Sequence, residues 1–144
     1  MSKPNERKTL QALRQILAAT KTIAVVGLSA RPDRPSHNVS AYLQEQGYQI
    51  IPVNPNLSEA LGVQAYPSLR EVPVPIDVVD IFRHPEDVPS IVEDAIAIGA
   101  KVVWMQLGIV NEEAATRAEA AGLIVVMDNC MSATHRLLRA KGDI

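Results

Sequence analysis

Apolar residues occur along this chain in short continuous runs, separated by stretches in which polar and apolar residues mix. A short continuous run rich in β-branched residues is typical of a strand buried on both faces, as in a parallel sheet. The pattern predicts strands at Thr22–Val26, Tyr48–Val53, Asp77–Phe82, Lys101–Gln106 and Leu123–Met127, and it leaves room for a short strand within Gly62–Pro67.

Helical spacing and capping residues predict the helices between these strands. Ahead of the first strand, Leu10, Leu13, Ile16 and Leu17 fall on one face and predict an amphipathic helix over Asn5–Ala19. Four more helices are expected. One has Ser36 as its N-cap and ends near Gln46, and the next has Pro85 as its first helical residue and ends near Gly99. The last two have Asn111 and Ser132 as N-caps and end near Ala121 and Ala140.

Strands and helices therefore alternate, which is the pattern of a parallel sheet covered by helices on both faces. Right-handed crossovers limit the topology to a single doubly wound, mostly parallel, Rossmann-like α/β sheet. We expect residues 1–144 to form one domain, with the helix in residues 1–20 packed on it. Because Pro52 has no amide hydrogen, its strand is expected to lie at an edge of the sheet or to lose its pairing at this residue. The pattern leaves the strand order open.

Composition and charge exclude several classes of function. The formal net charge is −2 and aromatic residues make up 3%, which argues against a nucleic-acid partner that needs a positive field or a stacking platform. Cys130 is the single cysteine, and the polar segment Met1–Lys8 has no signal-peptide core. No apolar run approaches membrane-spanning length. We therefore expect a cytoplasmic protein without membrane or nucleic-acid partners.

In doubly wound sheets, ligands bind beyond the carboxyl ends of the strands. The loop after the first strand, Gly27–Ser36, combines a glycine that permits a sharp turn, the hydroxyl of Ser29, the cations Arg31 and Arg34, and the start of a helix. A helix start is a natural phosphate site. The loop lacks the glycines of a dinucleotide fingerprint, so it favours a phosphorylated ligand over ordinary NAD. A plain strand–helix connection with solvated arginines explains it equally well.

Other strand ends carry weaker signals. Val53-Asn54-Pro55-Asn56 is either a rim against an adenine or ribose or a simple turn. Gln106 ends a strand at the same rim and is a candidate polar contact. Asp80 lies within an apolar strand and, if buried, needs a hydrogen-bond partner, so we interpret it as structural. Cys130 is interpreted as an inert, partly buried thiol.

Catalytic and metal-binding patterns are absent from the sequence. Ser29, Asp33 and His37 have the residue types of a hydrolytic triad, but they crowd one loop and lack a nucleophile elbow. His84 and the other histidines have no metal-ligand spacing. The residues indicate a binding pocket more clearly than a reaction.

A family resemblance adds to this reading. The motifs that carry it, in order, are I-A-V-V-G-L-S at 23–29, R-P-S-H at 34–37, V-N-P at 53–55, D-I-F-R at 80–83, V-W-M-Q-L-G-I at 103–109 and D-N-C-M at 128–131. From about Thr20 to Arg139 the chain resembles the small stand-alone CoA-binding domain proteins of bacteria. These are similar to the CoA-binding domain of the succinyl-CoA synthetase α subunit and of the acyl-CoA synthetases that form a nucleoside diphosphate.

The resemblance implies a Rossmann-like fold that binds coenzyme A or an acyl-CoA. Asn54 or Asn56 stands where the synthetase domain has a lysine, and the synthetase's active histidine belongs to a later domain that this chain lacks. The resemblance therefore implies a binding module without synthetase activity of its own. By analogy, the phosphate end of coenzyme A is wrapped by Gly27, Leu28, Ser29 and Ala30, with Arg31 nearby. The adenine side is lined by Val53, Asn54 and Pro55, and Phe82, Arg83 and His84 lie across the crevice. The candidate set is completed by Arg34, Ser36 and Gln106.

The sequence leaves three other hypotheses about the function open. One is a regulator that responds to a nucleotide or NAD, which the missing glycines weaken. Another is a small enzyme acting on a CoA thioester, with Cys130, His37 or His84 as participant. The third is an interaction protein with a vestigial pocket. A protein partner or a homo-oligomer is compatible with each of them.

Overall fold

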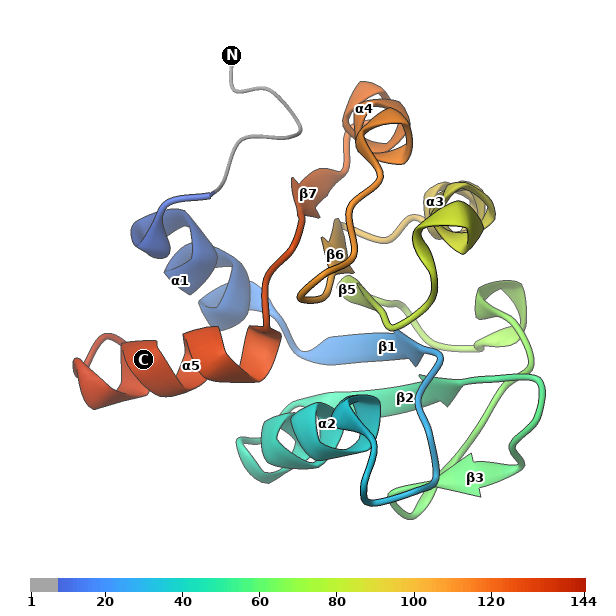
Figure 1. Cartoon of the computed structure of the whole chain (residues 1–144), viewed down its shortest axis with the longest axis horizontal. Helices are drawn as coiled ribbons and strands as arrows, with labels where there is room; N and C mark the ends of the chain where they lie inside the picture. Colours follow the sequence, from blue (N-terminus) through green and yellow to red (C-terminus); the bar gives the residue numbers. More distant parts are fainter. Residues whose placement is uncertain (1–7) are drawn as a thin grey trace.

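The computed structural model describes residues 8–144, which form a central sheet with helices on both sides (Figure 1). Five parallel strands lie in the order β2-β1-β5-β6-β7. This arrangement confirms the predicted doubly wound, mostly parallel α/β sheet and supplies the strand order. The strands are β1 (Thr22–Val26), β2 (Gln49–Val53), β5 (Val78–Ile81), β6 (Val102–Met105) and β7 (Ile124–Val126).

The strand order reverses between β1 and β5. From β1 the chain proceeds outward to β2, and it then returns to the other side of β1 to add β5, β6 and β7 in sequence. The connections that follow β1 and β5 therefore depart in opposite directions from neighbouring strands. This reversal opens a crevice at the carboxyl ends of β1 and β5, where ligands of doubly wound proteins bind.

The strand β2 lies at an edge of the sheet, as Pro52 predicts. Its outer side pairs only briefly with the returning chain: the Tyr66 N–H donates to the Pro52 carbonyl at 3.0 Å and the Asn54 N–H to the Tyr66 carbonyl at 2.9 Å. The short strand allowed within Gly62–Pro67 exists as β4 (Val63–Gln64), which pairs antiparallel with β3 (Glu59–Ala60).

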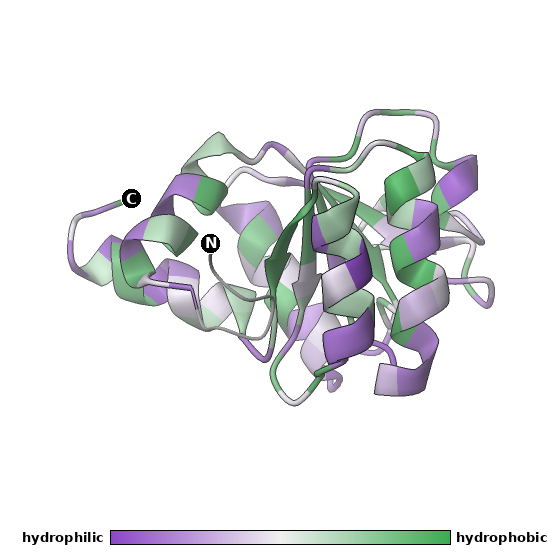
Figure 2. Ribbon diagram, turned by 90° about the horizontal axis from the view of Figure 1, so that it is seen from above, coloured by the Kyte–Doolittle hydropathy of each residue, from purple (hydrophilic) through white to green (hydrophobic). Residues whose placement is uncertain are grey.

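Alternate side chains of each central strand enter two different layers of the core. Figure 2 shows the strands nearly edge-on, with hydrophobic residues concentrated in them and helices on both sides. One layer contains Val25, Val78 and the fully buried Trp104, and the other contains Val79 and Ile81. The first layer is completed by α1 (Leu10–Ala19), α2 (Pro35–Glu45) and α5 (Met131–Ala140), and the second by α3 (Val88–Ala97) and α4 (Glu112–Ala120).

Two of the predicted N-caps are wrong. Helix α2 begins at Pro35 after Arg34, because proline at the first helical position is already preorganised, and the hydroxyl of Ser36 instead accepts the Ser29 N–H at 3.0 Å. Helix α5 begins at Met131 and not after Ser132, because a side-chain oxygen of another segment accepts the first N–H of the helix.

The remaining helix starts fit the prediction more closely. Asn111 caps α4, with its side-chain oxygen 2.9 Å from the Ala114 nitrogen, as expected. Pro85 opens a short 3-10 turn (Pro85–Asp87), so that α3 itself starts only at Val88. Helix α1 starts at Leu10, capped by Thr9. Residues 5–7, with which the sequence predicts this helix to begin, lie outside the described part of the chain. None of the described helices is long and apolar enough to cross a membrane.

The carboxylate of Asp77 joins three strands at their amino ends. One oxygen accepts the N–H groups of Lys21 and Thr22 at 2.9 and 3.0 Å, and the other lies 3.3 Å from the Lys101 ammonium. Burial opposes ionisation, but these hydrogen bonds and the Lys101 charge outweigh it and lower the pKa of Asp77. The carboxylate therefore stabilises the starts of β1 and β6 around β5.

Replacing Asp77 by alanine is expected to lower the free energy of unfolding by about 2–3 kcal/mol at pH 7, because two backbone donors lose a charged acceptor. Since folding lowers this pKa, the difference from wild type should shrink as the pH falls below about 4. Urea unfolding at pH 7 and pH 3.5 measures it. Asp33→Ala, which removes an exposed ion pair, is the control and should change stability by less than about 1 kcal/mol. Equal effects for the two variants would contradict the role given to Asp77.

Candidate ligand-binding crevice

Three chain segments meet at Gly27, directly after β1. Its N–H donates to the Val53 carbonyl at 2.9 Å, which ties it to the end of β2. Its φ of +92° belongs to a region that side chains with a Cβ rarely adopt. A Cβ at this position would lie 2.5 Å from the Phe82 carbonyl oxygen and 3.0 Å from the Cδ of Arg83. The sequence-predicted segments after β1, β2 and β5 therefore converge on one point at the strand-order reversal.

The loop after Gly27 is braced against the first turn of α2. The Ser29 N–H donates to the Ser36 hydroxyl, the Ser29 hydroxyl accepts the Arg31 N–H at 3.1 Å, and the Ser29 carbonyl contacts His37 Nδ1 at 3.0 Å. In these bonds both serine hydroxyls accept backbone N–H groups of the loop. The bonds leave Ala30, Arg31 and Arg34 exposed at the rim, as a binding loop requires.

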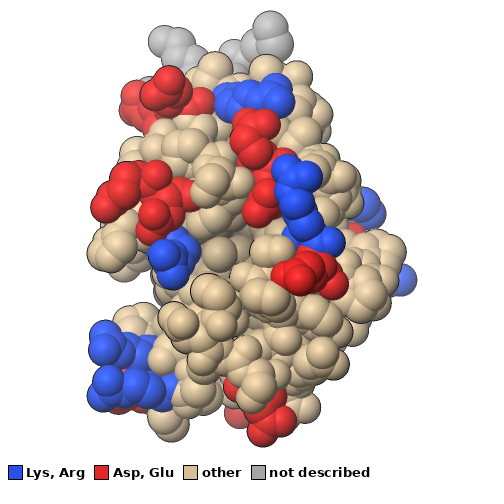
Figure 3. Space-filling view, turned by 90° about the vertical axis from the view of Figure 1, so that its right-hand side faces the viewer, with Lys and Arg blue, Asp and Glu red and all other residues tan. Residues whose placement is uncertain are grey.

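Two of the three arginines of the crevice pair with carboxylates at the surface. Arg31 lies 3.2 Å from Asp33, and Arg83 lies 3.4 Å from Asp87. Exposed pairs of this kind contribute little, so an incoming phosphate can replace the carboxylate. Within residues 8–144, Arg34 forms no ion pair. Figure 3 faces the carboxyl ends of the strands and shows a notch beside a lobe that carries Lys or Arg side chains.

The side-chain amide of Asn54 forms hydrogen bonds with the protein's own backbone. Its Nδ2 donates to the Leu28 carbonyl at 3.1 Å, and its Oδ1 accepts the Asn56 N–H at 2.9 Å. The side chains of Leu28 and Val53 are buried, at 0% and 3% exposure. These predicted site residues shape the loop and offer a ligand mainly their backbone, whereas Pro55 is exposed beside them.

A cavity of about 210 Å³ lies in this crevice, between the ends of β1 and β2 and helix α3. Gly27, Val53, Pro55 and Arg83 line it, so it brings together four of the predicted residues. The same cavity is lined by residues that the sequence analysis missed, among them Ser68, Leu69, Ser90, Ile91 and Asp94. No local signal marks these residues, because they reach the crevice through the pairing of Tyr66 with Val53 and through the packing of α3 on the sheet.

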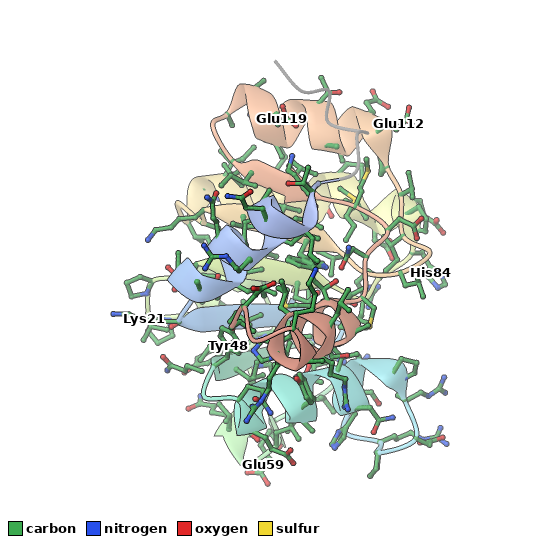
Figure 4. All side chains as sticks on the ribbon, turned by 90° about the vertical axis from the view of Figure 1, so that its left-hand side faces the viewer. Lys21, Tyr48, Glu59, His84, Glu112 and Glu119 are labelled. Carbon is green, nitrogen blue, oxygen red and sulfur yellow. The ribbon has the colours of Figure 1, made fainter. Side chains whose placement is uncertain are left out.

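A larger hollow of about 600 Å³ lies at the opposite end of the sheet, between α1 and β7. Figure 4 labels Lys21 at one edge of the view and His84, at the crevice end, at the opposite edge. Size alone favours this hollow as a ligand site. The strand-order reversal, the turn at Gly27 and the exposed arginines are all found at the carboxyl end, and these features favour the crevice.

Gln106 lies beside the crevice but is buried, at 3% exposure. Its Nε2 donates to Asp80 Oδ1 at 2.5 Å, and its Oε1 accepts the Met131 N–H at 3.4 Å. The side chain of Gln106, which the sequence predicts as a polar contact for a ligand, therefore connects β5 with the start of α5. Asp80 has the partner that a buried carboxyl needs, although its second oxygen has none. Burial raises the pKa of Asp80 to about 7, against the opposing effect of the Gln106 hydrogen bond.

The structure does not assemble a catalytic site from the candidates in the loop. His37 contacts the carbonyl of Ser29 and not its hydroxyl, and Asp33 pairs with Arg31. His84 is exposed and precedes the turn Pro85–Asp87 without a side-chain capping bond. Cys130 is partly buried, with Sγ 3.4 Å from the Ser132 hydroxyl. In the described part of the chain, no three His, Cys, Asp or Glu residues group as metal ligands would.

A doubly wound sheet with a crevice at its strand-order reversal places the chain among the Rossmann-like α/β proteins. Residues 21–136 match the family described as the CoA binding domain, and the chain belongs to this family.

Three relatives locate the chain within the family. It is 48% identical over 127 residues to the uncharacterized protein YneT of Bacillus subtilis (strain 168), covering 88% of this chain and 94% of that protein. A solved structure of a hypothetical protein from Pyrococcus horikoshii OT3 superposes with a TM-score of 0.91 at 43% identity, over 96% of this chain and 98% of that one. Acetate–CoA ligase (ADP-forming) II of Archaeoglobus fulgidus is 30% identical over 101 residues, which are 69% of this chain and 15% of the ligase.

Proposed function

We propose that this protein binds coenzyme A, or an acyl-CoA, in the crevice at the carboxyl ends of β1 and β5, and that it acts as a binding module without a reaction of its own. The observation that carries the proposal is the convergence at Gly27. There the backbone of three segments approaches so closely that no side chain fits, and the loop that leads from this point carries exposed arginines to the start of α2.

The charges around Gly27 suit the phosphates of coenzyme A. This ligand carries a diphosphate and a third phosphate on its ribose, and the crevice rim carries Arg31, Arg34 and Arg83, all exposed. Arginine forms planar, bidentate hydrogen bonds with phosphate oxygens. The dipole of α2 adds a favourable potential at its N-terminus, where Pro35 follows the loop.

The family comparison supports the same ligand. The ligase of Archaeoglobus fulgidus is named for its use of CoA, and this chain corresponds to 15% of its length. A likeness confined to that part supports a shared binding role and gives no support to ligase activity in this chain. A reaction would also need side chains that the crevice does not assemble, since Ser29, His37 and Asp33 form no triad.

Isothermal titration calorimetry with coenzyme A, NAD and ATP tests the proposal. We expect binding of coenzyme A in preference to the other two ligands. Arg31→Ala should weaken it about 5- to 10-fold, because one charged hydrogen-bonding group is lost. Arg117→Ala is the matched control, since Arg117 is an exposed arginine paired with Glu93 on the outer side of α3 and α4. Absence of coenzyme A binding, a preference for NAD, or equal effects of both variants would overturn the proposal.

A further inference from the structure

The loop after β6, residues 107–110, exposes apolar side chains at the crevice end of the sheet. Leu107 is 71% exposed, the largest value among the large apolar residues of the described chain, and Val110 is 42% exposed. The intervening Ile109 packs against the core formed with α3 and α4. A single exposed leucine is common on protein surfaces, but here two exposed apolar residues lie within one short loop at the crevice end of the sheet.

This exposure does not come from a loosely held loop. The Gly108 N–H donates to Asp128 Oδ1 at 2.7 Å, and the Ile109 N–H donates to the Gln106 carbonyl at 2.9 Å. Asp128 itself has a φ of +54°, a conformation that non-glycine residues seldom adopt. The loop is therefore fixed from the side of β7, and its anchored backbone holds Leu107 outward.

The loop is continuous with the crevice. The Asn111 Nδ2 donates to the Pro85 carbonyl at 2.9 Å, which fastens the end of the loop to the segment that follows Arg83 and His84. Figure 4 labels His84 and Glu112, the sequence neighbours of these two partners, on the same side of the molecule. At the other end of the crevice, Arg83 lies against Gly27. One rim thus runs from the β1 loop through the β5 loop to the β6 loop.

Polarity changes along this rim. The β1 loop contributes Arg31 and Arg34, the β5 loop contributes Arg83, and residues 107–110 contain no charged side chain. The strands β1 and β6 flank β5 in the sheet, so the loops after β1 and β6 lie on opposite sides of the β5 loop. A ligand that lies along the rim would meet cations at one end and exposed hydrocarbon at the other. Acyl-CoA has this polarity, with its phosphates at one end and an acyl thioester at the other.

We propose that Leu107 and Val110 form the contact surface for the acyl chain, and that the physiological ligand is an acyl-CoA with a hydrocarbon chain longer than acetyl. This inference rests on the proposed binding of coenzyme A in the same crevice. Each methylene that leaves water for an apolar surface adds to the affinity, so the affinity should rise with the length of the chain.

Titration calorimetry with coenzyme A, acetyl-CoA and hexanoyl-CoA tests the inference. We expect hexanoyl-CoA to bind the wild-type protein about tenfold more tightly than acetyl-CoA, because part of its added chain is buried. In Leu107→Ser this ratio should fall to about twofold or less. Leu137→Ser provides a matched control, since Leu137 is a leucine 51% exposed on α5, outside the rim, and it should retain the wild-type ratio.

The outcomes separate the two proposals. If coenzyme A binds but hexanoyl-CoA gains nothing over acetyl-CoA, the acyl surface is refuted and the binding function stands. If the gain exists but survives in Leu107→Ser, another surface holds the chain and the assignment to residues 107–110 is wrong. If none of the three ligands binds, the binding function itself fails. The affinity ratio within each variant cancels any change in the binding of the coenzyme A portion, and thermal melting confirms that each variant is folded.

Discussion

Replacing Gly27 by alanine is expected to destabilise the protein by about 2–4 kcal/mol and to abolish detectable binding of coenzyme A. The added Cβ would lie 2.5 Å from the Phe82 carbonyl oxygen, and this atom cannot move without displacing the end of β5. The backbone at Gly27 also has a φ of +92°, which adds strain. Urea unfolding measures the loss of stability, and calorimetric titration of the folded variant measures the loss of binding.

Gly122→Ala separates the two causes. Gly122 has the same φ of +92°, but no atom lies within 4 Å of the position of its Cβ. This control carries the backbone strain without the steric overlap, and it is expected to lose about 1–2 kcal/mol and to keep its affinity. Equal destabilisation of the two variants would mean that the close approach of Phe82 is not what requires glycine at position 27. Normal binding by folded Gly27→Ala would remove Gly27 from the ligand site.

The second large effect that we expect is a pH dependence of the stability, caused by the buried carboxyl of Asp80. Its pKa is raised to about 7 by burial, so the folded protein keeps a proton there that the unfolded chain releases near pH 4. Between these values the folded state binds more protons than the unfolded state, and its stability therefore falls as the pH rises. The full loss across this window is on the order of 4 kcal/mol, and the curve should level off above the folded pKa.

Asp80→Asn isolates this contribution, because asparagine fits the same space, still accepts the Gln106 hydrogen bond and does not titrate. Urea unfolding from pH 4 to pH 9 should show the stability of wild type falling relative to Asp80→Asn as the pH rises toward 7, and a constant difference beyond it. The comparison cancels other groups that titrate in this range, such as His135, whose pKa is lowered by burial and by the charge of Arg139. Parallel curves for the two proteins would show that Asp80 is ionised, or solvated, throughout.

Local sequence signals predicted much of the fold. Continuous apolar runs identified all five strands of the main sheet, because strands buried on both faces need apolar residues at every position. Pro52 placed its strand at an edge and Asn111 capped its helix, since each effect depends only on the residue's own hydrogen-bonding groups. The N-caps predicted at Ser36 and Ser132 are wrong, because a serine caps a helix only where the helix begins directly after it. The first helical positions are already occupied by Pro35 and Met131.

In the candidate site, too, local properties could be predicted from the sequence and contacts between distant segments could not. Gly27, Arg31, Arg34 and Arg83 were found from the sequence because a sharp turn and exposed cations are local properties. The partners of Asn54 and Gln106 could not be predicted, because they are the Leu28 carbonyl and Asp80, which strand pairing brings close from distant parts of the chain. The apolar rim at Leu107 was missed for the same reason, since its exposure depends on what packs around the loop.

By itself, the sequence determined the class of fold and the family resemblance, and it predicted which end of the sheet carries the candidate crevice, because periodicity, turns and local motifs depend on consecutive residues. Tertiary structure alone decided the strand order, the convergence of three segments on Gly27, the use of Gln106 by Asp80 and Met131, and the continuity of the arginine loop with Leu107. These features depend on distances between residues far apart in the chain, and such distances exist only once the sheet has paired and its helices have packed.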